Sequence, residues 1–138
     1  MVTPHCPYCG KDAELVTGEA IYAHLPHLHH LQYWACETCD AYVGCHAKGA
    51  RVGSITSDGT LPLGTLANAH LRSARSLAHR TFDPLWRSNK SQRRAAYAWL
   101  ANELKIPTNK CHIAMMDAST CSKVVVLAQR RLHQHGCF

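Results

Sequence analysis

Two Cys-x-x-Cys pairs constrain this chain more than any other feature. Cys6 and Cys9 stand in the stretch CPYCG, and Cys36 and Cys39 stand in CETCD. Such a turn directs both sulfurs at one ion, and Gly10 suits the positive φ that the turn often needs. Two facing turns supply four thiolates and leave no position for water. The pairs therefore predict one zinc ion with a structural rather than a catalytic role.

The segment between the two pairs predicts a zinc ribbon. Residues 14–23 (ELVTGEAIYA) read as two short strands around Gly18, and residues 31–36 (LQYWAC) read as a third strand with β-prone aromatic residues. The 26 residues between the pairs exceed the usual short spacing, and a long hairpin would fill them. Because so small a module has little core, zinc binding is expected to supply much of its folding free energy.

Cysteine usage also bears on the compartment. The first ten residues contain neither a charged n-region nor an apolar h-region, which predicts no secretion signal and a cytoplasmic location. In a reducing compartment, clustered cysteines bind metal more often than they form disulfides. No apolar run approaches the roughly 18–20 residues of a membrane span. We therefore interpret the cysteines as metal ligands and expect no membrane partner.

Two Cys-His dipeptides are candidates for a second metal site. They are Cys45-His46 and Cys111-His112, and thiolate and imidazole both suit zinc. Adjacent side chains tend to point in different directions, so each dipeptide is a poor chelating pair. The alternative interpretation is that Cys45 and Cys111 are small buried side chains.

A histidine cluster lies inside the expected hairpin. HLPHLHH contains His24, His27, His29 and His30, and Pro26 interrupts any regular element there. We therefore expect a loop at the hairpin end, away from the cysteine turns. No carboxylate accompanies these histidines as a general base, which argues against a catalytic metal site.

The hydrophobic pattern divides the chain and predicts an α+β fold. A zinc-ribbon module of short antiparallel strands is expected over residues 1–48, and a basic three-helix domain over residues 65–138. Residues 49–64 are rich in Gly, Ser and Thr and predict a long connection or a loose hairpin.

Three amphipathic helices are expected in the second half. Apolar residues at three- and four-residue steps predict the first over about residues 65–82, ended by Pro84. The second is expected from Ser91, as N-cap, to about residue 105, with Pro107 beyond its end. The third runs from Asp117, as N-cap, to about residue 134, and Gly136 is suited to close it.

Charge is unevenly distributed between the two halves. Residues 1–64 contain three Lys and Arg against six Asp and Glu, whereas residues 65–138 contain twelve against three. Four zinc-bound thiolates would make the first half more negative still. A basic half next to an acidic metal module predicts contact with a polyanion on one side only. The alternative is a charged surface that keeps the protein in solution.

Several basic residues are candidates for phosphate contact. The run RSNKSQRR precedes or opens the second helix, where backbone N–H groups also favour anions. Trp86 nearby is suited either to stack on a base or to pack into the core. The candidate phosphate ligands are Arg72, Arg75, Arg87, Lys90, Arg93 and Arg94.

Five stretches of the chain are distinctive when taken together. They are CPYCG, YWACETCDAYVGCH, PLGTLANAHLRSARSLAHRTFDPLW, RRAAYAWLANELKI and CHIAMMDASTC. In these stretches the chain resembles a family of small zinc-finger-containing proteins from phages, prophages and other bacteria. The resemblance covers most of the chain and implies zinc ligation by Cys6, Cys9, Cys36 and Cys39, without implying an activity. The stretch HLPHLHH is not part of it.

These observations favour a non-catalytic, phage-type zinc protein that binds nucleic acid, or a nucleic-acid-handling host complex, through its basic helical half. Affinity would then fall with salt and show little sequence preference. The second hypothesis is a protein-binding adaptor or inhibitor of a host defence or transcription complex. The third is a metal-dependent nuclease that uses the clustered histidines or His46, and the scarcity of carboxylates argues against it.

Overall fold

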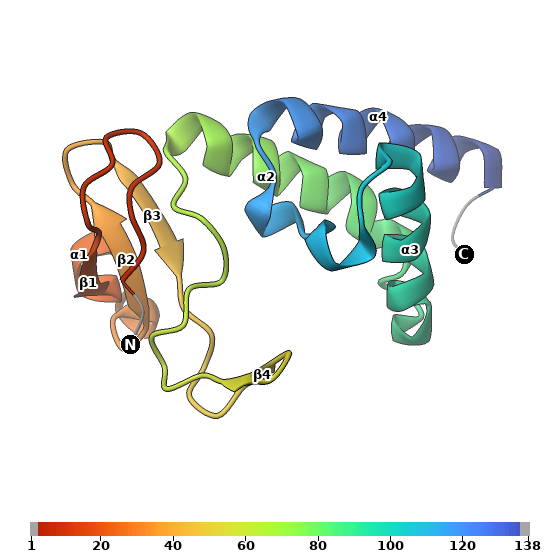
Figure 1. The fold of residues 1–138 in the computed structure, drawn as a ribbon. Helices are drawn as coiled ribbons and strands as arrows, with labels where there is room; N and C mark the ends of the chain where they lie inside the picture. The colour runs from red at the N-terminus through yellow and green to blue at the C-terminus, as the bar shows by residue number, and fades with distance from the viewer. Residues whose placement is uncertain (1–2, 136–138) are drawn as a thin grey trace. The chain divides into compact units, whose positions relative to one another are not determined.

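The computed structural model describes residues 3–135, and the chain divides into two compact units, Met1–Ala69 and His70–Phe138. The first unit contains a small antiparallel sheet and the second contains three helices (Figure 1). The predicted α+β fold class is thus confirmed. None of the helices in the described part of the chain is long and apolar enough to cross a membrane.

The sheet of the first unit has three strands in the order β1-β2-β3, namely β1 (Glu14–Thr17), β2 (Gln32–Cys36) and β3 (Ala41–Gly44). The strand expected in LQYWAC is β2. It pairs with both neighbours, so that Glu14 lies opposite Ala35 and Cys36 lies opposite Ala41. β2 is therefore the central strand, and it carries the Cys36 thiol at its last residue.

The strand expected after Gly18 is not formed. Residues Gly18–Ile21 form the single helical turn α1, and the backbone N–H of Gly18 donates to the carbonyl oxygen of Leu31 at 2.7 Å. A Cβ atom at residue 18 would collide with the carbonyl oxygen of Leu28. The two backbone segments therefore approach so closely here that only glycine fits. The prediction was wrong because β1 pairs directly with β2, which leaves the intervening residues to close the hairpin.

The histidine-rich stretch occupies that hairpin end. Its centre is a short 3₁₀ turn, η1 (Pro26–Leu28). Thr17 pairs with Gln32 at this end of β1 and β2, whereas Cys36 ends β2 at the other. The expected placement of the histidines away from the cysteine turns is confirmed.

Residues 49–64 fold as part of the first unit. They include a small hairpin of β4 (Arg51–Val52) and β5 (Ile55–Thr56), after which the chain returns along β3. Isolated bridges pair Tyr42 with Ala67 and Cys45 with Pro62. The indole Nε1 of Trp34 donates to Thr60 O at 2.7 Å. The division between the units accordingly falls after residue 69, five residues beyond the expected end of the connection.

A small core holds this unit together. Trp34 is 2% exposed and Leu66 is fully buried. Because Leu66 and Ala67 pack within the first unit, the first long helix begins later than the apolar period predicts. The core of the first unit comprises Cys6, Ala13, Trp34, Cys36, Ala41 and Leu66.

The second unit contains the three predicted helices, α2 (Ala69–Phe82), α3 (Arg93–Leu104) and α4 (Ala118–His135). Asp117 caps α4, since its Oδ1 accepts from the backbone N–H of Thr120 at 2.8 Å. Ser91 does not cap α3. It lies in the 3₁₀ turn η3 (Lys90–Gln92), where its N–H donates to the Asn89 side chain. Gly136 lies outside the described residues.

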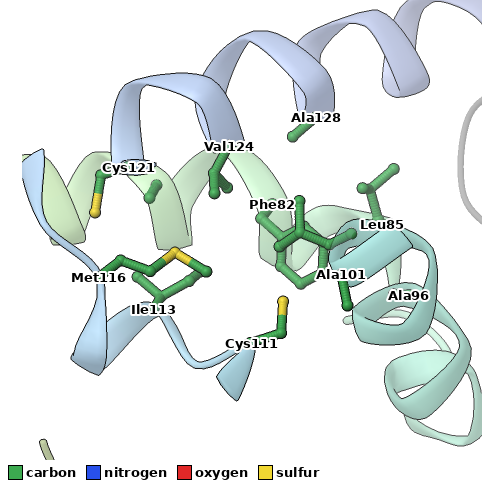
Figure 2. Close-up of a cluster of buried hydrophobic side chains, with 12 residues drawn as sticks. Phe82, Leu85, Ala96, Ala101, Cys111, Ile113, Met116, Cys121, Val124 and Ala128 are labelled. Atoms are coloured by element: carbon green, nitrogen blue, oxygen red, sulfur yellow. The ribbon is translucent and has the colours of Figure 1, made fainter. Parts of the chain in front are cut away.

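Short 3₁₀ turns connect the helices and complete the core. They are η2 (Asp83–Leu85), η4 (Thr108–Lys110) and η5 (Ile113–Met115). Figure 2 shows the side chains of Phe82 from α2, Val124 from α4 and Ile113 from η5 converging in one cluster. On α4, the apolar side chains of Cys121, Val124 and Ala128 are buried in this cluster.

Candidate metal centre and basic pocket

The thiols of Cys6, Cys9, Cys36 and Cys39 meet at one point of the first unit. All four sulfurs lie within 4.8 Å of one another. The Sγ atoms of Cys9 and Cys36 are 3.7 Å apart, far longer than the roughly 2.05 Å of a disulfide. Four sulfurs at about 2.3 Å from a tetrahedral zinc ion would be separated by about 3.8 Å. The spacing of this sulfur pair therefore matches zinc coordination.

Two similar turns position the four thiols. Cys6 and Cys9 precede β1, and the N–H of Gly10 donates to Cys6 O at 2.8 Å. Gly10 has the expected positive φ of +78°. The second turn joins β2 to β3 and ends in Asp40, whose φ is +49°. The positive φ at Asp40 was not predicted, although Asp is one of the few non-glycine residues that adopt this conformation readily.

The protonation of the thiols depends on their mutual contact. Burial of the Cys6 thiol favours its neutral form, but hydrogen bonds from the backbone N–H groups of Tyr8 and Cys9 lower its pKa to about 7. Burial, together with hydrogen bonds to the other three sulfurs, raises the pKa of Cys39 to about 12. Four adjacent thiolates repel one another, and a divalent cation among them removes that penalty.

This donor set fits a structural zinc ion. Cys6 and Cys36 are buried, Cys39 is half-buried and Cys9 is exposed. Four protein sulfurs complete a tetrahedron, so zinc held here would have no open position for substrate or water. Among the described residues, no other group of three or more His, Cys or carboxylate side chains gathers closely enough to hold a metal. The single four-cysteine cluster is consistent with one structural zinc ion.

The two Cys-His dipeptides belong to different units. In the first unit, Cys45 packs against the core, and burial followed by the charge of Asp58 raises the pKa of its thiol. The adjacent backbone carbonyl of His46 accepts from Ser57 Oγ at 3.1 Å. In the second unit, Cys111 is 1% exposed inside the core, and burial raises its pKa. Cys111 is therefore a small buried side chain, whereas Cys45 is half-buried against the first core.

Within the histidine cluster, His29 makes structural contacts, and the four imidazoles, all of them on described residues, do not form a group that could hold a metal ion. Nε2 of His29 lies 3.1 Å from the carbonyl oxygens of Tyr22 and Ala23. Carbonyl oxygens only accept, so Nε2 carries a proton and holds the loop closed. The side chains of His24, His27 and His30 are exposed.

Three of the predicted phosphate ligands surround one pocket of the second unit. Lys90, Arg93 and Arg94 line a cavity of about 410 Å³ at the start of α3. His112, which the sequence suggested only as a metal ligand, lines it too, as does Tyr97. Tyr97 follows Arg93 by four residues on one helix face, a spacing that would have identified it. The pocket brings together side chains that are separate in sequence.

Arg93 is held against two aromatic rings. Its guanidinium carbon lies 4.9 Å from the ring centre of Tyr97 and 5.3 Å from that of Trp86. Such cation–π contacts restrict a side chain that is otherwise flexible. Trp86 also packs against the second core. Of the two roles predicted for Trp86, the structure shows packing.

The remaining candidate phosphate ligands lie elsewhere. Arg75 is only 8% exposed, and its Nε donates to the carbonyl oxygen of Met116 at 3.0 Å. Arg72 is half-buried on the same helix. Arg87 is exposed and lies 3.9 Å from the carboxylate of Asp83. The Arg75 side chain is thus buried in a structural hydrogen bond and is not placed to contact phosphate.

Comparison with known proteins agrees with the metal centre. Neither the curated proteins nor the solved structures yielded a match to this chain. Residues 2–131 match a protein family described as a zinc-finger-containing domain. This match includes all four cysteines of the cluster and nearly all of the helical unit. The chain therefore belongs to the family of zinc-finger-containing domains, with Cys6, Cys9, Cys36 and Cys39 as its tetracysteine site.

Proposed function

We propose that this protein binds nucleic acid through its basic second unit, and that zinc stabilises the first unit without taking part in chemistry. The observation that carries the proposal is the convergence of Lys90, Arg93 and Arg94 on one pocket. None of the described residues that line this pocket has a carboxylate. Three cations in a lining whose described residues hold no carboxylate create a positive local potential that favours a polyanion.

The charge balance of the unit supports the same proposal. Residues 70–138 contain twelve Lys and Arg against three Asp and Glu. The backbone of a nucleic acid carries one negative charge per phosphate, and binding it releases condensed counterions. Contacts to phosphate position a protein but carry no sequence information. We therefore propose affinity for many sequences, with a strong dependence on salt.

We propose that the protein acts in the bacterial cytoplasm as a phage or prophage protein. The resemblance to phage and prophage proteins supports that setting. A four-cysteine metal site needs reduced thiols, and a reducing compartment such as the cytoplasm keeps thiols reduced. In that setting the basic, nucleic-acid-binding protein would act at a host complex that handles nucleic acid. The proposed role contains no catalytic step.

A protein-binding adaptor or inhibitor is the second candidate, and the β4–β5 hairpin favours it. Val52 and Ile55 are cross-strand partners and are 38% and 55% exposed. An apolar pair at the tip of a small hairpin is a suitable contact for another protein. Co-purification of a host protein that survives nuclease treatment would support this candidate.

A binding measurement with matched variants tests the leading proposal. The zinc-loaded protein is titrated into a fluorescently labelled single strand and into the corresponding duplex at low salt. Replacement of Lys90, Arg93 and Arg94 by Gln is expected to weaken binding strongly. Replacement of Arg80, Lys123 and Arg130 by Gln removes the same charge from exposed positions outside the pocket and is expected to have a much smaller effect. No binding of either nucleic acid at low salt would contradict the proposal.

A further inference from the structure

The pocket at the start of α3 is a half-open hollow that both polar and apolar side chains line. Besides the three cations, Thr108 contributes a hydroxyl group and His112 an imidazole, whereas the Ser91 hydroxyl donates to Asn89 Oδ1 at 2.6 Å. Successive phosphates of a regular duplex lie on a convex surface, for which a flat or ridged basic patch suffices. A cavity of about 410 Å³ is large enough to surround a single phosphate group together with its sugar. The half-open hollow thus favours one phosphate seated in it over a row of phosphates along a flat surface.

The charge of the pocket favours a phosphomonoester over a phosphodiester. Lys90, Arg93 and Arg94 carry three positive charges, and the described lining residues supply no negative one. A diester phosphate inside a nucleic acid strand has a single negative charge. A monoester carries about −1.5 to −2 charges at neutral pH and has three terminal oxygens as acceptors. A terminal phosphate therefore balances more of this positive charge than an internal phosphate does.

The arrangement of Arg93 suits recognition of terminal oxygens. Tyr97 and Trp86 lie at 4.9 and 5.3 Å from its guanidinium carbon and hold the group in place. Guanidinium N–H groups lie in the plane of the group and form a fork that matches two oxygens of one phosphate. A preorganised fork loses little conformational entropy on binding.

The backbone adds to these side chains. Ser91, Arg93 and Arg94 line the pocket, and they stand where η3 leads into the 12-residue helix α3. The backbone N–H groups of Ser91, Gln92 and Arg93 already donate to Asn89 and Lys90, so the helix start adds the partial positive charge of its dipole rather than free donors. The pocket thus combines three cations with the partial positive charge of a helix start.

We propose that this pocket binds the phosphomonoester at the end of a nucleic acid strand. The inference rests on the proposed function and makes it specific, because it distinguishes strand ends from strand interiors. Recognition lies in the phosphate group, so the terminal base is expected to have little influence. The Arg93 guanidinium and the Lys90 ammonium contact the terminal oxygens, and Arg94 neutralises the adjoining diester.

Three labelled DNA strands of one sequence test this inference with the zinc-loaded full chain. One strand has a 5′-phosphate, one has a 3′-phosphate, and one has hydroxyl groups at both ends. At near-physiological salt, at least one phosphorylated strand is expected to bind about tenfold more tightly than the hydroxyl strand, as one additional charge-assisted hydrogen bond would give. Equal affinity for all three strands would overturn the inference while leaving the proposed function intact. Failure of all three to bind at low salt would refute both.

Variants and small competitors identify the site and the source of the phosphate. Replacement of Arg93 by Lys keeps the charge but removes the fork, and it is expected to weaken binding of the phosphorylated strands more than binding of the hydroxyl strand, so that the preference for phosphorylated ends falls. The control with Gln at positions 80, 123 and 130 is expected to keep the preference. A nucleoside 5′-monophosphate and inorganic phosphate are expected to compete only weakly, since neither supplies the adjoining diester. Competition by either at the concentration of the strand would show that the ligand is a small phosphate, and would overturn the assignment to a strand end.

Discussion

The Sγ atoms of Cys9 and Cys36 lie 3.7 Å apart although 27 positions separate the two residues in sequence. The hairpin of β1 and β2 brings them together, with Cys9 before its first strand and Cys36 at the end of its second. Neither turn alone offers more than two sulfurs. The metal centre is therefore a product of the fold of the first unit, and zinc in turn is expected to stabilise that fold.

Removal of zinc is expected to unfold the first unit and to leave the second folded. The first unit has only a small core around Trp34, and zinc binding contributes on the order of 10 kcal/mol in such modules. The second unit has a core of its own. Hydrogen exchange read by mass spectrometry should show β1, β2 and β3 losing protection after chelation, while α2, α3 and α4 keep theirs. Unchanged protection of the three strands after complete chelation would contradict this expectation.

The zinc content should depend on Cys36 and be independent of the cysteines outside the cluster. Replacement of Cys36 by Ser leaves three sulfurs and is expected to reduce bound zinc well below one per chain. Replacement of Cys45 or Cys121 by Ser is expected to leave one zinc per chain, since neither belongs to the cluster. Elemental analysis of the purified variants provides the measurement. A wild-type content near two would show that a second site exists.

Replacement of Arg75 by Ala should destabilise the second unit without acting on binding directly. The change removes the donor to Met116 O and leaves a buried carbonyl oxygen without its partner, at a cost of about 1–3 kcal/mol. Replacement of the exposed Arg80 by Ala is expected to change stability by no more than about 0.5 kcal/mol. Urea unfolding measures both. Where the Arg75 variant is folded, its affinity for a single strand should equal that of the wild type within about twofold.

Replacement of His27 and His30 by Asn should leave both zinc content and stability unchanged, because both side chains are exposed at the hairpin end. Replacement of His29 by Asn should also retain zinc, but it removes the contacts to the Tyr22 and Ala23 carbonyl oxygens. The expected loss is about 0.5–1.5 kcal/mol in thermal or urea unfolding. Loss of zinc from any of these variants would place the histidines at the metal centre.

The local features of the fold could be predicted because they depend on neighbours in sequence. The Cys-x-x-Cys turns, the cap at Asp117 and the end of α2 before Pro84 are of this kind. The turn at Gly18 could not, because it depends on close packing against Leu28. The strand pairing that draws residues 61–67 into the first unit likewise depends on contacts with distant residues.

The candidate site was predicted in part for the same reason. The basic run around Lys90 and Arg93 is contiguous, so its charge was visible in the sequence. His112 joins the same pocket through the fold of the second unit, which the sequence pattern does not reveal. Arg75 had a recognisable signal, because it stands four residues after Leu71 and three before Ala78, both on the apolar period of α2. The prediction gave more weight to the charge of Arg75 than to this helical spacing and therefore counted Arg75 among the phosphate ligands.

The dependence of binding on salt tests the central claim most directly. The association constant of the zinc-loaded protein for a single strand is measured over a range of salt concentrations, for the wild type and for the variant with Gln at positions 90, 93 and 94. The account predicts a steep decline for the wild type. In the variant the slope should be smaller by about 1.4, which is about 0.7 units for each of the two phosphates that the pocket no longer binds. Identical slopes for the two proteins would contradict binding through this pocket.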